Sequence, residues 1–489
     1  MGGLLIGEGG KVRMQILEME EKININEVVS AAKGRLVRGD KDISVSAVSI
    51  DTRTIKEGEL FVAIKGDRFD GHDFVLQAFE MGACGAVIDR SQSDKIEKRI
   101  KDDTKALIAV DDTITALQEM AAFHRQKYYI RVVGVTGTNG KTTTKEMIAK
   151  ILGQRLWVLK NEGNLNNHIG VPLTLLRLNK RHQAAVIEMG MSGLGEIRRL
   201  CEIAAPNIGV VTNIGAAHLE GLGSIENVIK AKGEIIESLS ESDTAVINAD
   251  DKNSVSLKNK AKGKVITFGI DNDADIRAVD IRHQSPAGTA FAIIKGKDKI
   301  DISLSLSGRH NIYNALAAAA ASLMLNFDLE DVKAGLEGFE PFKMRSEIMI
   351  LNSGLRIIND SYNANPASME AAISLLSDFK NNGRTFAVLG GMFELGDYAR
   401  EAHLNIGRAA VDSGVDYLIV VGELARFIVS GASSAGMKQD NIFVCMDHQE
   451  AVDILNRLTD SGDTILIKGS RKMAMERIAE GLIKGDKRI

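Results

Sequence analysis

Short apolar runs alternate with longer amphipathic stretches through most of the chain, for example the apolar run at residues 130–137 after the helical stretch at 115–128. Apolar runs without polar alternation are typical of strands that are buried on both faces of a parallel sheet. The amphipathic stretches suit the helices that connect such strands. The pattern therefore predicts an α/β protein with parallel sheets and without a fixed-period repeat.

The chain has 489 residues, which exceeds one ordinary domain and suggests about three. Residues 1–107, including a short N-terminal extension, are expected to form a small mixed α/β domain. A central parallel-sheet domain is predicted at residues 108–339. Residues 340–489 repeat the alternation and are expected to form a second open α/β sheet of the Rossmann-like type.

Individual strands are predicted where a short apolar run ends in a polar turn. In the first domain these are residues 43–50, 60–64 and 85–89. In the central domain they are 130–137, 184–190, 208–213, 244–250 and 264–269, and in the last domain 355–360, 385–391, 416–421, 441–446 and 463–469. An alanine-rich helix is expected around 315–322, and Asn365-Pro366 is a typical helix start, with a capping residue before a first-turn proline. The charged stretch 94–105 is expected to be a solvated helix or loop face.

A glycine- and threonine-rich segment, GVTGTNGKTT at residues 134–143, is the strongest chemical signal in the sequence. It follows a predicted strand and precedes a helical pattern. In that setting backbone N–H groups curl around an anion and the helix dipole attracts it. Lys141 is placed to reach the β- and γ-phosphates and Thr142 to ligate magnesium. The general P-loop pattern has glycine where this chain has Val135.

The segment nevertheless predicts a nucleoside triphosphate site in a P-loop NTPase-like central domain. The residues expected to hold the phosphates are Gly137, Thr138, Asn139, Gly140, Lys141, Thr142 and Thr143.

Three further residues of the central domain are candidates for the same site. Glu188 ends a predicted strand, where a carboxylate can coordinate magnesium beside the phosphates. His218 lies in a glycine-rich loop after the next strand, and a lone histidine there is more often structural than a ligand. Lys232 lies 14 residues further on, and by itself it would be an ordinary surface residue of a helix.

Together these motifs resemble those of the Mur ligase family, and the resemblance covers nearly the whole chain. The motifs that carry it are VTGTNGKTT, IEMG, NIGAAHLEGLGS, KAKGE and SGRHNIYNALAA. The resemblance implies three domains that bind a UDP-sugar, ATP and the incoming amino compound in turn. NLNNHIGVPLTLL, DSYNANP and LGGMFELG are similar to motifs of the members that join D-Ala-D-Ala to UDP-N-acetylmuramoyl-tripeptide through an acyl phosphate.

The resemblance also implies roles for single residues. Lys141, Glu188, His218, Lys232 and Arg345 would be catalytic. Thr142, Glu188, His218 and Lys232 would hold metal, with two magnesium ions and with Lys232 as a possible carbamate. Asn311 would contact adenine, and Arg345 and Asp360 would reach phosphate and ribose. Ser49, Asp51, Thr52 and Arg53 would bind the UDP-sugar, since hydroxyl and guanidinium groups suit a diphosphate.

Composition excludes several other classes of protein. The chain carries 61 basic and 65 acidic side chains, a net charge of −4, which gives no sign of a nucleic-acid-binding surface. Its three cysteines are scattered, which argues against disulfides or a zinc site. No signal peptide is evident, and the longest apolar stretch, 315–325, is too short for a membrane span. We therefore expect a cytoplasmic protein, and the family resemblance favours a monomer.

Three alternative functions stay open at this point. The chain could be a sister ligase that adds a single amino acid to a UDP-muramoyl peptide, or glutamate to folate. It could also be a P-loop ATPase that works as a switch, or a catalytically dead scaffold. The run Tyr362-Asn363-Ala364-Asn365-Pro366 weighs against the sister ligases. The presence of Lys141, Thr142, Glu188 and His218 weighs against a scaffold. The sequence leaves open whether the tripeptide's third residue is diaminopimelate or lysine.

Overall fold

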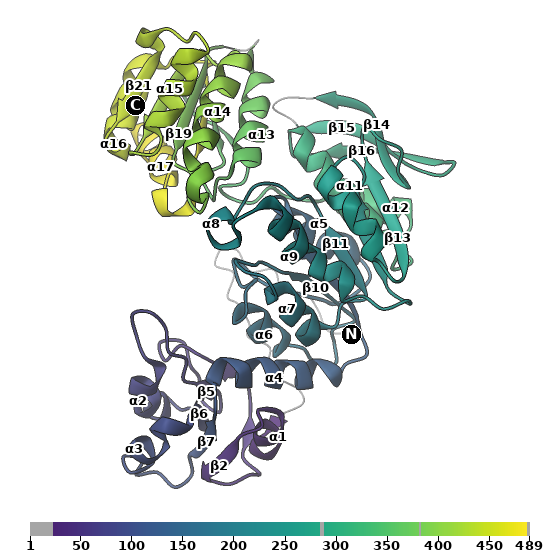
Figure 1. The fold of residues 1–489 in the computed structure, drawn as a ribbon, viewed down its shortest axis with the longest axis vertical. Coiled ribbons are helices and arrows are strands. Elements are labelled where there is room, and N and C mark those ends of the chain that lie inside the picture. The colour runs from purple at the N-terminus through teal and green to yellow at the C-terminus, as the bar shows by residue number, and fades with distance from the viewer. Residues whose placement is uncertain (1–22, 284–287, 381–382, 487–489) are drawn as a thin grey trace, which may run out of the picture. The chain divides into compact units, whose positions relative to one another are not determined.

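The computed structural model describes residues 23–283, 288–380 and 383–486, so the predicted N-terminal extension lies outside the described residues. The chain divides into two compact units (Figure 1). The first comprises the described residues up to Tyr128 together with Pro172–Arg181, and the second comprises Tyr129–Val171 and the chain from His182 onward. These units do not correspond one to one with the three predicted domains, whose boundaries stay predictions.

The first unit is a mixed α/β fold around a five-stranded sheet in the order β2-β7-β6-β5-β4. Its strands are β2 (Arg35–Arg38), β4 (Val48–Ser49), β5 (Leu60–Val62), β6 (Gly85–Asp89) and β7 (Ala106–Val110), and β1 (Ile23–Asn24) pairs separately with β3 (Ser44–Val45). Its helices are α1 (Ile25–Ala31), α2 (Val75–Glu80), α3 (Ser93–Glu97) and α4 (Thr113–Gln126). The single strand predicted at 43–50 is wrong: the segment forms two short strands, β3 and β4, in different sheets.

The second unit contains a nine-stranded sheet in the order β16-β15-β14-β13-β12-β11-β8-β10-β9. The strands are β8 (Arg131–Thr136), β9 (Val158–Lys160), β10 (Ala184–Glu188), β11 (Ile208–Val211), β12 (Thr244–Asn248), β13 (Lys264–Gly269), β14 (Ile276–His283), β15 (Thr289–Lys295) and β16 (Asp298–Leu304). Pairing is parallel from β9 to β14 and antiparallel for β14–β15–β16. The sequence pattern missed β9 and the antiparallel strands; β16 alternates exposed and buried residues, unlike the parallel strands.

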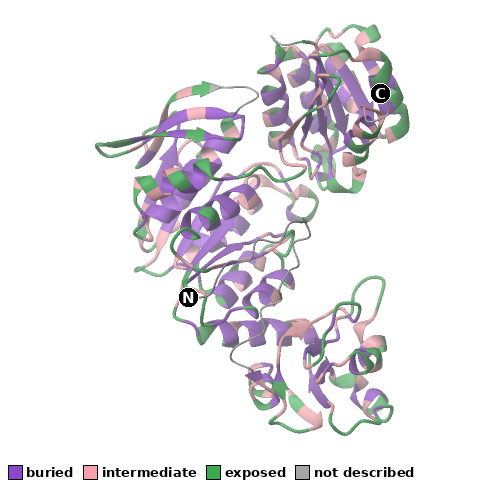
Figure 2. Ribbon diagram, turned by 180° about the vertical axis from the view of Figure 1, so that it is seen from behind, coloured by how far each residue is buried: buried purple, intermediate pink, exposed green. Residues whose placement is uncertain are grey.

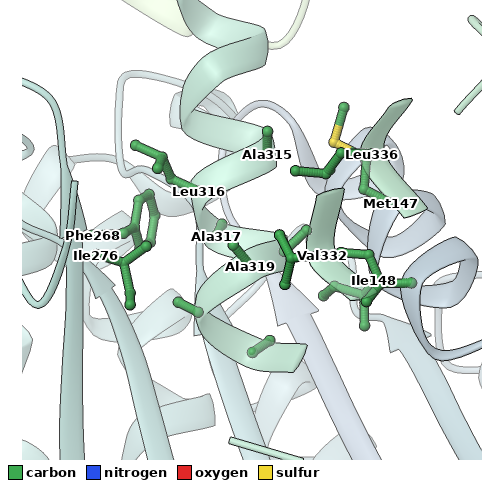
Figure 3. Close-up of a cluster of buried hydrophobic side chains, with 14 of the residues drawn as sticks. Met147, Ile148, Phe268, Ile276, Ala315, Leu316, Ala317, Ala319, Val332 and Leu336 are labelled. Carbon is green, nitrogen blue, oxygen red and sulfur yellow. The ribbon is translucent and has the colours of Figure 1, made fainter. Parts of the chain in front are cut away.

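Helices pack on this sheet (Figures 1 and 2). They are α5 (Lys141–Leu152), α7 (Glu196–Ala204), α9 (Ile225–Glu237), α10 (Lys252–Val255), α11 (Arg309–Leu323) and α12 (Leu329–Glu337). The short helix α8 (Leu219–Leu222) packs beside α9, and α6 (Gly170–Leu175) crosses the division between the units. The alanine-rich helix α11 is buried along almost its whole length. Figure 3 shows its small side chains beside Met147 and Ile148 of α5 and Leu336 of α12.

The last block forms a six-stranded sheet in the order β17-β18-β22-β19-β20-β21, parallel except at β17. Its strands are β17 (Glu347–Ile350), β18 (Arg356–Asn359), β19 (Thr385–Gly390), β20 (Tyr417–Val421), β21 (Ile442–Cys445) and β22 (Thr464–Lys468). Its helices are α13 (Pro366–Ser377), α14 (Ala399–Asp412), α15 (Arg426–Ser434), α16 (His448–Leu458) and α17 (Glu476–Asp486). Two separate apolar clusters, one including α13–α15 and one including α16 and α17, cover the sheet as in a doubly wound fold.

The predicted α/β class with mostly parallel sheets is confirmed. The predicted cap of α13 is also confirmed, because Asn365 accepts from the Ser368 N–H at 3.0 Å and proline follows it. Within the described part of the chain, no helix combines the length and the apolar character needed to cross a membrane.

Gly335 on α12 allows this helix to pack closely against α5, the helix that follows the phosphate loop. A Cβ at this position would lie 2.6 Å from Cγ1 and 2.7 Å from Cα of Ile151 on α5. We expect Gly335→Ala to destabilise the central sheet by about 1–3 kcal/mol because the two helices must separate. Urea unfolding followed by the fluorescence of Trp157, the chain's one tryptophan, measures this change.

Ala334→Met is the matched control, because it enlarges an exposed position on the same helix. It should change stability by no more than about 0.5 kcal/mol. Equal stability of Gly335→Ala and the wild type would contradict the close-packing argument.

Candidate active site

The loop between β8 and α5 has the conformation that a phosphate-binding loop requires. Gly137 and Gly140 adopt φ angles of 153° and 79°, which favour glycine. A Cβ at Gly137 would lie 1.9 Å from Thr212 Oγ1, and one at Gly140 would lie 2.0 Å from Asn314 Oδ1. Backbone strain and lack of space therefore both restrict these two positions to glycine.

The loop is held in shape by residues that follow the neighbouring strand β11. Thr138 N–H donates to Asn213 O and Asn139 N–H donates to Asn213 Oδ1, each at 2.9 Å. Thr212 Oγ1 donates to Asn139 O at 2.6 Å. The sequence interpretation missed Thr212 and gave Asn213, the first residue of the NIGAAHLEGLGS motif, no role of its own, although polar residues at the end of a buried strand were the signal that had identified Glu188.

Two ammonium groups point at the backbone of this loop. Lys141 Nζ donates to Gly137 O at 2.8 Å and to Thr138 O at 3.1 Å, and Lys232 Nζ donates to Gly137 O at 2.9 Å. Lys232 is 2% exposed, so the view of it as an ordinary surface residue is wrong. Burial lowers the pKa of both lysines, and the charge of Lys141 further lowers that of Lys232. An anion in the loop would stabilise both charges.

Glu188 ends β10 with its carboxylate beside the start of α5. Thr142 Oγ1 donates to Glu188 Oε2 at 2.8 Å, and Asn166 Nδ2 donates to Glu188 Oε1 at 2.7 Å. A hydroxyl and a carboxylate are the hard oxygen ligands that magnesium prefers, so this pair fits the ion. Across the residues that the structure describes, no three His, Cys, Asp or Glu side chains form a complete metal site. Magnesium bound here would take its remaining ligands from water and from substrate phosphates.

His218 lines the same cavity but has a different partner. It adopts a φ of 55° immediately before the short helix α8, and its Nδ1 lies 2.7 Å from Glu394 Oε2. Burial lowers the pKa of His218 and the nearby Lys232 charge lowers it further, while Glu394 opposes both. The neutral ring is thereby favoured, and a neutral ring is the form that binds metal. Glu394 lies in the LGGMFELG motif, but the sequence interpretation gave it no role of its own.

The last block contributes a second group of charged residues. The guanidinium of Arg345 lies 3.9 Å from the centre of the Tyr362 ring. Asp360 accepts from Ser346 N–H at 3.0 Å and pairs with Lys468 Nζ at 2.5 Å. Lys468 ends β22 and is 2% exposed, and the sequence interpretation had missed it.

A cavity of about 1010 Å³ brings these groups together. The predicted residues that line it are Thr138, Asn139, Gly140, Lys141, Thr142, Thr143, Glu188, His218, Lys232, Asn311, Arg345 and Asp360. Of the predicted nucleotide and metal residues, only Gly137 lies outside this lining. Asn311 is 4% exposed and donates to Ser307 O at 2.9 Å, so its side chain is firmly oriented.

The residues predicted for the UDP-sugar lie in the first unit, at the end of β4. Arg53 forms a two-pronged ion pair with Asp51, with N–O distances of 2.9 and 2.6 Å, and this contact lowers the pKa of Asp51. Ser49 Oγ donates to Asp51 O at 3.2 Å, and Thr52 is buried. The structure gathers the four residues into one turn, with the Arg53 guanidinium largely exposed. Their role in binding stays a prediction.

Comparison with known proteins gives a consistent picture. The Mur ligase family catalytic domain matches residues 44–125, the Mur ligase middle domain matches 135–322, and the Mur ligase glutamate ligase domain matches 344–471. The UDP-N-acetylmuramoyl-tripeptide–D-alanyl-D-alanine ligase of Bacillus subtilis (strain 168) is 39% identical over 464 residues, covering 95% of this chain and 99% of the relative.

Solved structures agree with the sequence matches. MurF from Acinetobacter baumannii is similar with a TM-score of 0.86 and 31% identity, covering 95% of this chain and 99% of that one. MurF ligase from Thermotoga maritima in complex with ADP is similar with a TM-score of 0.80 and 29% identity, covering 90% and 98% respectively. The chain belongs to the Mur ligase family.

Proposed function

We propose that this protein is an ATP-dependent ligase that joins D-Ala-D-Ala to UDP-N-acetylmuramoyl-tripeptide and produces the UDP-muramoyl-pentapeptide precursor of peptidoglycan. The names of the relatives and the ADP complex of one of them support this substrate set and ATP use. The main structural support for the proposal is that the phosphate loop, Lys141, Glu188 and Arg345 line one cavity. A plain ATPase would not account for the full-length similarity to ligases.

The reaction needs an activated carboxyl group, because a carboxylate has no useful leaving group for attack by an amine. A carboxylate oxygen of the tripeptide attacks the γ-phosphorus of ATP, and the bond between that phosphorus and ADP breaks. The amine of D-Ala-D-Ala then attacks the acyl carbon and loses a proton. Phosphate leaves with the oxygen that came from the carboxylate.

The chief obstacle is repulsion between the triphosphate and the carboxylate. The loop amides, Lys141 and Arg345 provide fixed positive charge where the phosphates would lie. Magnesium, when bound, neutralises phosphate charge and polarises the transferred phosphoryl group. We propose that Thr142, Glu188 and His218 hold two such ions, with Lys232 helping as a carbamate, the last on the strength of the family resemblance.

The remaining assignments are proposals of the same kind. Asn311 would contact adenine and Asp360 the ribose, and Ser49, Asp51, Thr52 and Arg53 would bind the UDP-sugar. Residues 1–107, 108–339 and 340–489 would serve the UDP-sugar, ATP and the dipeptide respectively. We further propose a monomer that works in the cytoplasm.

The reaction is tested by measuring the release of phosphate from ATP in the presence of magnesium. UDP-muramoyl-tripeptide and D-Ala-D-Ala are added singly and together. We expect release only when both are present, with the pentapeptide product identified by mass. Release with single amino acids as acceptor would instead indicate a sister ligase. Release with ATP alone would indicate a P-loop ATPase.

Glu188→Gln tests the metal role, since it keeps the side chain's size but removes its charge. We expect kcat to fall on the order of 100-fold or more, because a magnesium ligand that stabilises transferred charge supplies several kcal/mol. Folding should be retained, as judged by thermal unfolding. Wild-type turnover by a folded variant would remove Glu188 from the mechanism.

Lys232→Ala tests the carbamate. Activity should fall strongly and recover in part with added short carboxylic acids, which can replace the missing carbamate. Lys230→Ala, two residues away on the same helix at an exposed position, should retain activity and show no effect of the acids. Full activity of Lys232→Ala would exclude this lysine from catalysis.

A further inference from the structure

A further buried lysine, Lys145, lies close to the site and has no role in the proposed reaction. It lies on α5 three residues after Thr142 and is fully buried. Its Nζ donates to the backbone carbonyl of Asn161 at 2.6 Å and lies 3.0 Å from Glu146 Oε1. The same nitrogen lies 4.0 Å from Glu188 Oε2, the oxygen that also accepts from Thr142.

Asn161, which directly follows β9, connects this lysine to the backbone of Glu188. Glu188 N–H donates to Asn161 Oδ1, and Asn161 Nδ2 donates to Glu188 O, both at 2.9 Å. Asn161 Nδ2 also lies 2.9 Å from Leu165 O, next to Asn166, whose amide holds Glu188 Oε1. The lysine thus faces the Glu188 carboxylate directly and supports its main chain through one intermediate residue.

The charges around Lys145 form a chain from the surface to the site. Lys160, which is 40% exposed, pairs with Glu146 Oε2, while Glu146 Oε1 pairs with Lys145. Burying an ammonium group costs free energy of folding unless its partners are well placed. An apolar residue would fill the same volume with a smaller loss of stability. Met147 and Ile148, which follow Glu146 on the same helix, are part of the apolar core. Position 145 instead holds a cation next to the predicted magnesium ligand.

We infer that Lys145 is a positioning residue that fixes the Glu188 carboxylate beside Thr142 for the magnesium-bound nucleotide. The inference rests on the proposed function, because it assigns a magnesium role to Glu188. Lys145 does not itself touch the phosphates in this scheme. It fixes the side-chain direction and the main-chain position of Glu188, the residue that binds the ion in this scheme.

Loss of Lys145 should therefore weaken metal-dependent binding specifically. Groups that orient metal ligands typically contribute about 10-fold to 100-fold in metal affinity or activity. The phosphate-loop amides and Lys141 are unchanged by the loss, so nucleotide affinity without magnesium should be unchanged. A purely structural lysine would affect both affinities alike.

The test measures ADP binding by calorimetry with and without magnesium, together with kcat and KM, for the full-length protein. Lys145→Met removes the charge at similar length, and Lys145→Met/Glu146→Gln also avoids leaving Glu146 with an unbalanced buried charge. Lys160→Met is the matched control, because it removes only the exposed end of the charge chain. We expect magnesium's enhancement of ADP affinity to fall about 10-fold or more in both Lys145 variants and to persist in the control.

Unchanged magnesium enhancement in either folded Lys145 variant would overturn the inference. Loss of folding in both, detected by Trp157 fluorescence, would assign Lys145 to core stability alone and overturn it as well. A wild-type protein whose ADP affinity gains nothing from magnesium would remove the metal role on which the inference depends. Pentapeptide formation is measured separately on the wild type, so failure of the proposed reaction appears there, whereas failure of this inference appears only in binding.

Discussion

Positive charge must be fixed in place before a triphosphate and a carboxylate can approach each other, and this requirement explains much of the structure around the phosphate loop. Solvent or flexible side chains would have to reorganise during the reaction, whereas groups held by a folded backbone do not. Lys141 is held against the carbonyls of Gly137 and Thr138. The parallel sheet makes this possible, because β8 lies between β11 and β10 and their carboxyl ends share one edge.

Core packing and the site are connected through helix α5. The helix begins with Lys141 and Thr142, carries Lys145 on its next turn, and continues into a core lined by the alanines of α11 (Figure 3). Gly335 of α12 brings a further helix into contact with Ile151. Small side chains on the surrounding helices therefore fix the axis of α5, and the axis fixes where its first residues meet the phosphate loop and Glu188.

The sequence predicted those features that depend on short-range patterns. The phosphate loop, the strand ending at Glu188 and the start of α13 each have a local signature, and the structure contains all three. Features that depend on distant contacts were missed or misjudged. Lys232 looked like a surface residue because nothing near it in the chain shows that Gly137 covers it. Lys145 and Lys468 were overlooked for the same reason, since their partners Asn161 and Asp360 lie elsewhere in the sequence.

The proposed reaction requires that the tripeptide carboxylate becomes phosphorylated before the amine attacks. UDP-muramoyl-tripeptide labelled with ¹⁸O at both oxygens of the reacting carboxylate tests this order of events. Released phosphate is then examined by mass spectrometry after a reaction with ATP, magnesium and D-Ala-D-Ala. An acyl-phosphate route predicts one ¹⁸O atom in each phosphate, because the carboxylate oxygen leaves with phosphorus. Phosphate without the label, formed together with pentapeptide, would rule out an acyl-phosphate intermediate.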